Sequence, residues 1–159
     1  GDLTDSKWRN QLKTAEKKDF VIKSDFQRYE EMLRLYQEEQ RDKGFQGVSQ
    51  KILENLGKEP SPLKILYVLN EAEEMIAFDM FYVHGKDATY YIGWNSEEGR
   101  RNYLNNLLLY YGAIALKKMG VKKLDLGGIE YIHTESIAKF KDGMKPMHFR
   151  QIGEFVRIL

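Results

Sequence analysis

Cysteine is absent from the 159-residue chain, and histidine occurs only at His84, His133 and His148. Without cysteine the protein has no disulfide, no thiolate metal site and no cysteine nucleophile. Because the three histidines lie far apart in the sequence, no metal site is expected. No hydrophobic run approaches the roughly 18 residues of a membrane-spanning helix. No signal peptide opens the chain, so we expect a cytoplasmic location.

An excess of charge of either sign is also missing, because 25 basic residues are balanced by 24 acidic ones and the formal net charge is +1. Such a chain is not a general binder of polyanions, so contact with phosphate has to come from a local patch. The hydrophobic share of 42% and the charged share of 31% are typical of a globular protein. The length predicts one domain over residues 1–159, long enough to bury a core.

Hydrophobic spacing predicts an alternation of helices and strands. A capping-box pair, Ser24 and Gln27, begins the second helix, and Gly44 ends it. The expected helices cover residues 5–18, 25–42, 48–56, 99–119 and 134–141. The expected strands cover residues 19–24, 63–70, 75–84, 88–94, 123–126 and 153–159.

The three strands over residues 63–94 have short connectors, which predict an antiparallel meander. The stretch 88–126 is a β-α-β unit, whose long crossover helix predicts that the flanking strands are parallel. The fold class is therefore α/β (α+β), with a central mixed, mostly antiparallel sheet and flanking helices.

This order of elements resembles the GNAT acyltransferase superfamily. The resemblance implies that the strands before and after the long helix splay apart and hold an acyl donor near the N-terminus of that helix. Free N–H groups at a helix N-terminus suit a phosphate or pyrophosphate. We expect divergence at residues 92–95 and 124–128, with the groove roofed by a turn at residues 140–143.

The loop at the start of the long helix departs from the acetyl-coenzyme A enzymes of that superfamily. Those enzymes carry an Arg/Gln-x-x-Gly-x-Gly/Ala loop, whereas this chain reads Asn95-Ser96-Glu97-Glu98-Gly99-Arg100-Arg101. One glycine and two acids in that loop argue against coenzyme A.

Several short motifs resemble the FemA/FemB/FemX family, which transfers an amino acid from aminoacyl-tRNA to the peptide stem of a peptidoglycan precursor. They are Trp8-Arg9-Asn10 through Ala15-Glu16-Lys17, then Lys43-Gly44-Phe45, Leu124-Asp125-Leu126-Gly127-Gly128-Ile129 and Phe140-Lys141-Asp142-Gly143. Family members have two tandem GNAT-like domains, and this chain resembles the second, so it is expected to be the C-terminal half of a longer protein or a single domain. Met144 and Lys145 stand where the family has Phe-Gly.

The resemblance implies two catalytic residues, Lys141 and Phe140, and a carboxylate on a strand expected to be buried is a third candidate. Lys141 would stand near the reacting carbonyl and stabilise the oxyanion; the alternative is a solvated lysine in the last turn of a helix. Phe140 would supply a backbone N–H, or only pack in the core. Asp125, on a strand expected to be buried, either takes a proton from the attacking amine or holds a neighbouring loop.

Further residues around the expected groove are candidates for binding the donor or substrate. Arginines are unfavourable at a helix N-terminus, so an anionic donor would explain Arg100 and Arg101, as would surface placement. The paired glycines would let a ligand approach the backbone or would permit a turn. The candidates are Gly127, Gly128, Trp94, Arg100, Arg101, Gly143 and His133.

The leading functional hypothesis is an aminoacyltransferase that uses aminoacyl-tRNA, needs no cofactor or metal, and acts on an amine of a cell-wall peptide precursor. One alternative is an N-acyltransferase that uses acetyl-coenzyme A or an acyl carrier to modify an amino sugar. A third hypothesis is a non-catalytic domain that works beside an N-terminal companion domain.

Overall fold

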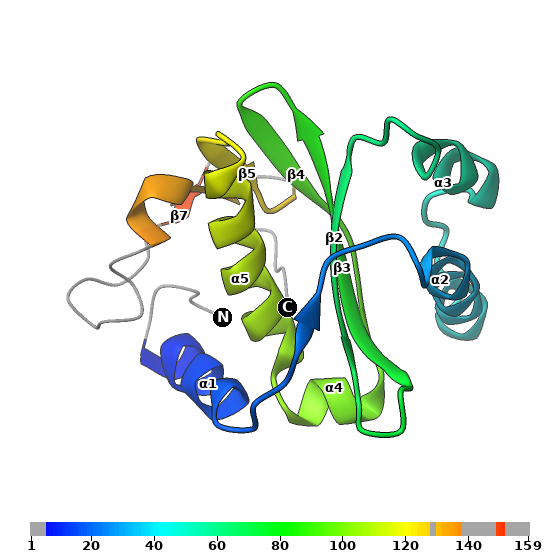
Figure 1. Ribbon diagram of the computed structural model, residues 1–159, viewed down its shortest axis with the longest axis horizontal. Helices are drawn as coiled ribbons and strands as arrows, with labels where there is room; N and C mark the ends of the chain where they lie inside the picture. Colours follow the sequence, from blue (N-terminus) through cyan, green and yellow to red (C-terminus); the bar gives the residue numbers. More distant parts are fainter. Residues whose placement is uncertain (1–5, 128–129, 138–148, 152–159) are drawn as a thin grey trace.

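The computed structural model describes residues 6–127, 130–137 and 149–151, arranged as a sheet between two helical layers (Figure 1). The helices are α1 Ser6–Glu16, α2 Tyr29–Lys43, α3 Gln50–Leu56, α4 Glu97–Arg101 and α5 Leu104–Lys118, with a 3₁₀ turn, η1, at Thr134–Ser136. The strands are β1 Ile22–Lys23, β2 Leu63–Leu69, β3 Met75–His84, β4 Asp87–Asn95, β5 Lys123–Asp125, β6 Glu130–His133 and β7 Phe149–Gln151.

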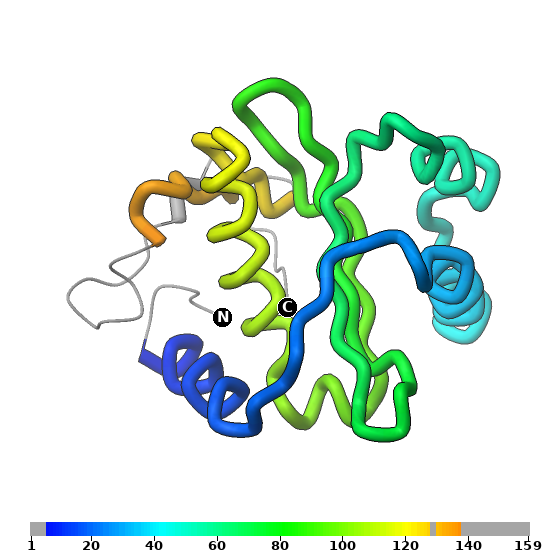
Figure 2. Tube along the Cα trace, viewed as in Figure 1, coloured from blue at the N-terminus to red at the C-terminus, as the bar shows by residue number. Residues whose placement is uncertain are grey.

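The seven described strands form one sheet in the order β1-β2-β3-β4-β5-β6-β7. All neighbours are antiparallel except β4 and β5, which are parallel and joined by the crossover through α4 and α5 (Figure 2). The predicted mixed, mostly antiparallel sheet is therefore confirmed, as is the antiparallel meander of β2, β3 and β4.

The core is divided between the two faces of the sheet. On one face α5 packs against β3 and α1 packs against α5, with Leu12, Phe81 and Leu108 fully buried. On the other face α2 and α3 cover a cluster that includes Phe78 and Met80. In the middle of β3, Ala77 and Phe81 belong to the first cluster and Phe78 and Met80 to the second, because successive side chains of a strand point to opposite faces. The central strand is consequently buried on both sides.

The expected continuous helix over residues 99–119 is wrong. The chain forms the short helix α4, turns at Asn102 and Tyr103, and begins again as α5. Tyr103 adopts a left-handed conformation with φ of 56°, which no residue inside an α-helix can have. Ser96 caps α4 by accepting a hydrogen bond from the Gly99 N–H at 3.1 Å.

The predicted start of the second helix is also wrong, because α2 begins at Tyr29 rather than residue 25. The Asp25 carboxylate accepts hydrogen bonds from the Gln27 N–H and the Tyr67 hydroxyl, at 3.0 and 2.6 Å. These bonds hold a turn in front of the helix and replace the expected capping box at Ser24. The helix ends as predicted at Gly44, which has a left-handed φ of 68°.

The region after β5 differs most from the prediction. Strand β6 was not expected, and the expected helix over residues 134–141 begins as the turn η1. The Thr134 hydroxyl donates to the Val121 carbonyl at 2.6 Å and ties this turn to the start of β5. The expected strand over residues 153–159 lies outside the described residues, and the first strand is limited to Ile22–Lys23.

Candidate functional site

Strand β4 loses its β5 neighbour part of the way along its length. The two strands pair only at Asp87, Ala88 and Thr89, which face residues 123–125. Residues 90–95 keep their β3 partners but have no β5 partner. The strand ends there because Gly127, with φ of 98°, turns the chain back, and the Leu126 N–H donates to the Glu130 carbonyl at 2.8 Å. The predicted divergence is confirmed for residues 92–95 and begins two residues earlier on β4, at residue 90. On the other strand it begins later than predicted, because Leu124 and Asp125 are still paired with β4.

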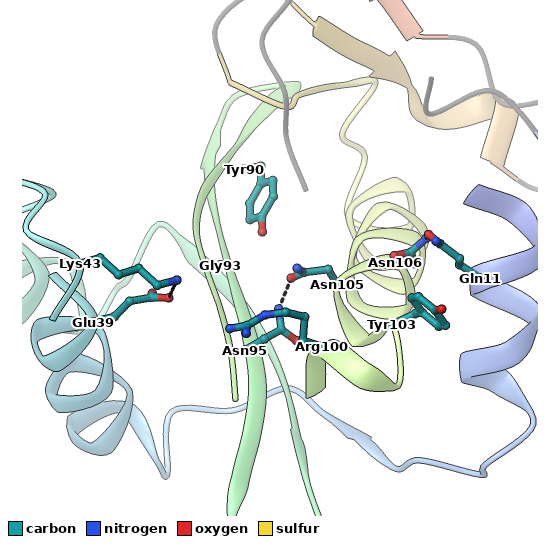
Figure 3. A pocket seen from close by; sticks show the side chains of 10 residues that line it. All are labelled: Gln11, Glu39, Lys43, Tyr90, Gly93, Asn95, Arg100, Tyr103, Asn105 and Asn106. Atoms are coloured by element: carbon teal, nitrogen blue, oxygen red, sulfur yellow. Dashed lines mark hydrogen bonds and ion pairs between the residues drawn. The ribbon is translucent and has the colours of Figure 1, made fainter. Parts of the chain in front are cut away.

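A cavity of about 500 Å³ lies beside this open edge of β4 (Figure 3). This volume is within the range of small-molecule sites. Five elements supply its walls, so it forms only in the folded chain. The lining residues are Gln11 of α1, Glu39 and Lys43 of α2, Tyr90, Gly93 and Asn95 of β4, Arg100 of α4, and Tyr103, Asn105 and Asn106 at the beginning of α5.

The N-terminus of α5 contributes positive potential to the pocket. The dipole of this 15-residue helix is positive at its N-terminus, although the Asn106 and Leu107 N–H groups already donate to the Tyr103 carbonyl. Arg100 adds a full charge and forms no ion pair with any described residue, whereas Arg101 pairs with Glu97 at 3.4 Å. Arg100 and the first turn of α5 can therefore hold an anionic group.

Side-chain amides make the same wall polar. Asn95 is buried, and its Nδ2 donates to Asn105 Oδ1, while its own Oδ1 has no hydrogen-bond partner among the described residues. Asn106 Nδ2 donates to the Trp8 carbonyl at 3.2 Å and to Gln11 Oε1 at 3.3 Å. This wall offers hydrogen bonds rather than hydrophobic contact to a ligand.

The single glycine of the loop before α5 has a packing role. A Cβ atom on Gly99 would lie 2.2 Å from the Ile76 carbonyl oxygen and 2.8 Å from Asn95 Oδ1. Only glycine fits against the end of β3 at this position. The loop therefore uses its glycine to bring α4 onto the sheet.

A buried carboxyl group lies behind the pocket wall. Asp79 of β3 has no exposed surface, and its Oδ1 accepts a hydrogen bond from the Tyr90 hydroxyl at 3.3 Å. Its Oδ2 has no hydrogen-bond partner in the described part of the chain. Burial raises the pKa of Asp79 well above its ordinary value of 3.8. Burial therefore favours the neutral form of the Asp79 carboxyl over the ionised one.

Gly93 makes the contact between Asp79 and Tyr90 possible. It lies opposite Asp79 in the pairing of β3 with β4, and a Cβ there would lie 1.8 Å from the Tyr90 hydroxyl oxygen. The missing side chain leaves the space that this hydroxyl occupies. Sequence reasoning missed this group, although an aspartate within the hydrophobic stretch Met75–His84 was a visible signal.

Helix α2 adds a second carboxylate. The side chain of Glu39 is only 16% exposed, and its carboxylate forms an ion pair with the Lys43 ammonium group at 2.8 Å. Burial, then the charge of Asp79 and its hydrogen bond, and then the charge of Glu39 raise the pKa of Tyr90 well above its ordinary value of 10.0. Neither Glu39 nor Lys43 was singled out as a site residue, because both look like members of an exposed i,i+4 pair.

Of the sequence-predicted residues that the structure describes, Arg100 lines the pocket. Trp94 instead stacks on Phe78 at 5.6 Å, on the α2 and α3 face. His133 is exposed at the end of β6, 5.4 Å from the Tyr131 ring.

Asp125 and Gly127 occupy the turn that ends β5. The Asp125 side chain accepts a hydrogen bond from the Gly127 N–H at 2.9 Å and so holds the turn. The remaining predicted residues, Gly128, Phe140, Lys141 and Gly143, lie outside the described residues, and their roles stay predictions.

Two further kinds of feature are absent from the described residues. No described helix combines the length and the hydrophobicity that crossing a membrane requires. Within the same residues, acidic and histidine side chains do not gather into a group of three or more that could hold a metal ion.

Comparison with known proteins agrees with this geometry. A family model described as an acetyltransferase (GNAT) domain matches residues 5–141. A solved GNAT-family acetyltransferase from Staphylococcus aureus Mu50 is similar, with a TM-score of 0.55 at 12% identity over 65% of this chain and 72% of that chain. The ribosomal-protein-S18-alanine N-acetyltransferase of Escherichia coli matches 48% of each chain at 23% identity, with a TM-score of 0.42. No curated protein sequence matches.

The order of strands, the parting of β4 from β5 and the match over residues 5–141 all agree. The chain belongs to the acetyltransferase (GNAT) domain family and is an acyltransferase domain.

Proposed function

We propose that the protein transfers an acyl group from a thioester or ester donor to an amine, and that the donor lies along the open edge of β4. The observation that carries this proposal is the loss of the β5 partner from residues 90–95, directly beside the pocket. An open strand edge presents unpaired N–H and C=O groups. A donor with amide groups in an extended arm can pair with them as an added strand does.

The anionic end of the donor binds Arg100 and the first turn of α5. A coenzyme A thioester and the 3′ end of an aminoacyl-tRNA both carry phosphate groups that suit such a site. The amine approaches from the α2 side, where Glu39 and Lys43 lie. Aligning an amine with an activated carbonyl supplies much of the rate. In this proposal Lys141 stabilises the oxyanion of the tetrahedral intermediate.

A coenzyme A thioester is the donor that we test first. The match to an acetyltransferase domain supports it, as does a pocket in which Arg100 is the unpaired cation among the described lining residues. An aminoacyl-tRNA donor with a cell-wall peptide amine as acceptor is the second candidate. Its support is the set of Fem-type motifs, one of which begins at Lys43 in the pocket wall.

Calorimetric titration with acetyl-coenzyme A tests the first donor. The wild type should bind saturably, and Arg100→Ala should bind about tenfold more weakly, the loss of one charge-assisted hydrogen bond. The matched control is Arg101→Ala, because the neighbouring arginine pairs with Glu97 instead. Equal losses in both variants would contradict the placement of the phosphate at Arg100.

A transfer assay decides between the donors. Wild-type protein is incubated with acetyl-coenzyme A and hydroxylamine, and separately with alanyl-tRNA and a lysine-containing peptide. Product only in the second reaction would replace coenzyme A by aminoacyl-tRNA. Donor binding without product in either reaction would instead favour a non-catalytic domain, and absence of both binding and product would contradict the proposal.

A further inference from the structure

A cluster of lysines lies at the C-terminal end of α5, away from the pocket at the N-terminus of that helix. The turn between β3 and β4 lies at the same end (Figure 1), and the Lys86 carbonyl in this turn accepts hydrogen bonds from the Lys122 and Lys123 N–H groups at 2.7 and 3.4 Å. Segments distant in the chain therefore meet in one surface. We call this surface the basic tip, and its residues are Lys86, Lys117, Lys118, Met119, Lys122 and Lys123.

The turn after α5 brings the lysines of this surface together. Gly120, with φ of 93°, turns the chain back directly after the helix, so Lys122 and Lys123 follow closely on Lys117 and Lys118 in the last helical turn. A helix dipole favours cations in its last turn, which accounts for Lys117 and Lys118 only. The lysines outside the helix need another explanation.

The positive charge of the basic tip is not neutralised within the described part of the chain. None of its lysines forms an ion pair there, although the acids Asp87 and Glu135 lie close to the tip in the chain. On α2, by contrast, Arg34 and Lys43 each pair with a glutamate. Like charges repel one another, and the whole chain has a net charge of only +1. The charge is therefore local, and an anionic partner would compensate it.

A hydrophobic side chain stands among these charges. Met119, which follows the last residue of α5, is 54% exposed. Binding to the phosphates of a nucleic acid uses cations and gains nothing from an exposed thioether. The interface of a bilayer accepts both, because lysines attract anionic headgroups and hydrophobic side chains insert between them. The combination therefore favours a lipid surface over a nucleic acid.

We propose that the basic tip docks the domain on an anionic membrane surface, with the lysines against the headgroups and Met119 inserted between them. This inference goes beyond the proposed function and does not depend on it. Helix α5 has 15 residues and is about 22 Å long at 1.5 Å per residue. The pocket at its other end therefore stays clear of the membrane and open to donor and acceptor.

Co-sedimentation with vesicles tests the docking without any measurement of activity. The wild type should bind vesicles of phosphatidylcholine that contain about one-third phosphatidylserine, and should not bind pure phosphatidylcholine. The triple variant Lys117→Gln, Lys118→Gln, Lys122→Gln should have a partition coefficient about 100-fold lower, which is about fivefold for each lysine. In about 1 M salt, where the screening length is about 3 Å, binding of the wild type should be lost.

The matched control removes the same charge from another surface. The triple variant Lys7→Gln, Lys13→Gln, Lys17→Gln changes exposed lysines in and directly after α1, a helix that contacts α5 near its N-terminus. It should bind anionic vesicles nearly as well as the wild type. Thermal unfolding should give the wild-type midpoint for both variants, because all six side chains are exposed. Equal losses of vesicle binding in the two variants would overturn the basic tip as the docking surface.

A single substitution tests the insertion of Met119. Met119→Ser should weaken binding to the anionic vesicles about fivefold, since about half of the side chain is free to be buried. Val21→Ser is the control, because Val21 is 65% exposed but lies before β1; it should bind as the wild type does.

Two outcomes would overturn membrane docking. One is vesicle binding that Met119→Ser leaves unchanged. The other is tighter binding to a short RNA duplex than to the vesicles at the same salt concentration, which would identify a nucleic-acid surface instead. A wild type that binds no anionic vesicle also overturns the docking, but it leaves the proposed acyl transfer untouched, because that reaction is measured without lipid.

Discussion

The two faces of the sheet have different chemistry. Under α2 and α3 the buried cluster is built from hydrophobic and aromatic side chains such as Met32, Leu53 and Met80. On the α5 side the core contains Asp79 together with polar side chains near the pocket, including Asn95 and Asn106. Buried polar groups cost stability. The comparison indicates that the α2 and α3 face mainly stabilises the fold. The α5 face is less stabilising near residues 90–95 of β4, which have no β5 partner.

The largest expected effect is on the stabilising face. Met80→Ala removes a fully buried side chain of β3 and should lower the free energy of unfolding by about 2–5 kcal/mol. Its neighbour Asp79 points to the other face, so the affinity of the folded variant for acetyl-coenzyme A should stay at the wild-type value. Urea unfolding and calorimetry measure the two quantities. A large loss of affinity in folded Met80→Ala protein would mean that the two faces are coupled.

The next effect is a pH dependence from Asp79. Its pKa is raised in the folded state, so unfolding releases a proton at any pH between its ordinary value of 3.8 and the folded pKa. The stability contributed by this group is therefore complete below pH 3.8 and falls as the pH rises, by up to about 1.4 kcal/mol per pH unit. Asp79→Asn removes this term.

Urea unfolding of both proteins between pH 5 and 7 measures the effect of Asp79 on stability. The free energy of unfolding of the wild type should fall relative to that of Asp79→Asn over this range. Other titrating groups are common to the two proteins and cancel in the difference. A difference that is independent of pH would mean that Asp79 is ionised in the folded protein.

The smallest expected effect is the loss of stability on removing a helix N-cap, compared at two helices. Ser49 accepts a hydrogen bond from the Ile52 N–H at the start of α3, and Ser96 accepts one from Gly99 at the start of α4. Replacing either by alanine should cost about 1 kcal/mol of stability in urea unfolding. Only Ser96→Ala should also weaken binding of acetyl-coenzyme A, because α4 carries Arg100. Equal affinities of the two variants would contradict a role of α4 in the site.

The local sequence pattern was sufficient to predict the structure where residues close together in the chain interact. The meander of β2, β3 and β4 was predicted nearly to its ends, because alternating hydrophobic runs with short polar connectors leave few other pairings. It was insufficient at Tyr103, where hydrophobic periodicity continues but a left-handed residue divides α4 from α5. The capping signature at Ser24 did not predict the helix start. Tyr67, 42 residues from Asp25 in the chain, donates a hydrogen bond to the Asp25 carboxylate and so stabilises a turn there.

The candidate site was predictable in position but not in composition. The divergence of β4 from β5 and the place of Arg100 followed from the order of elements and a family resemblance. Glu39, Tyr90 and Asp79 were missed, since each lies on an element whose own pattern explains it as surface or core. Trp94, expected in the groove, instead faces the other side of the sheet and stacks on Phe78.

The sequence by itself determined the alternation of strands and helices, the hydrophobic faces and the crossover that makes β4 and β5 parallel, because these follow from periodicity and connector length. Only the tertiary structure decided that β5 ends at Asp125, that five elements enclose one cavity, and that Gly93 leaves room for Tyr90 to reach Asp79. Those features depend on contacts between residues distant in the chain, and no local pattern encodes which distant side chains will meet.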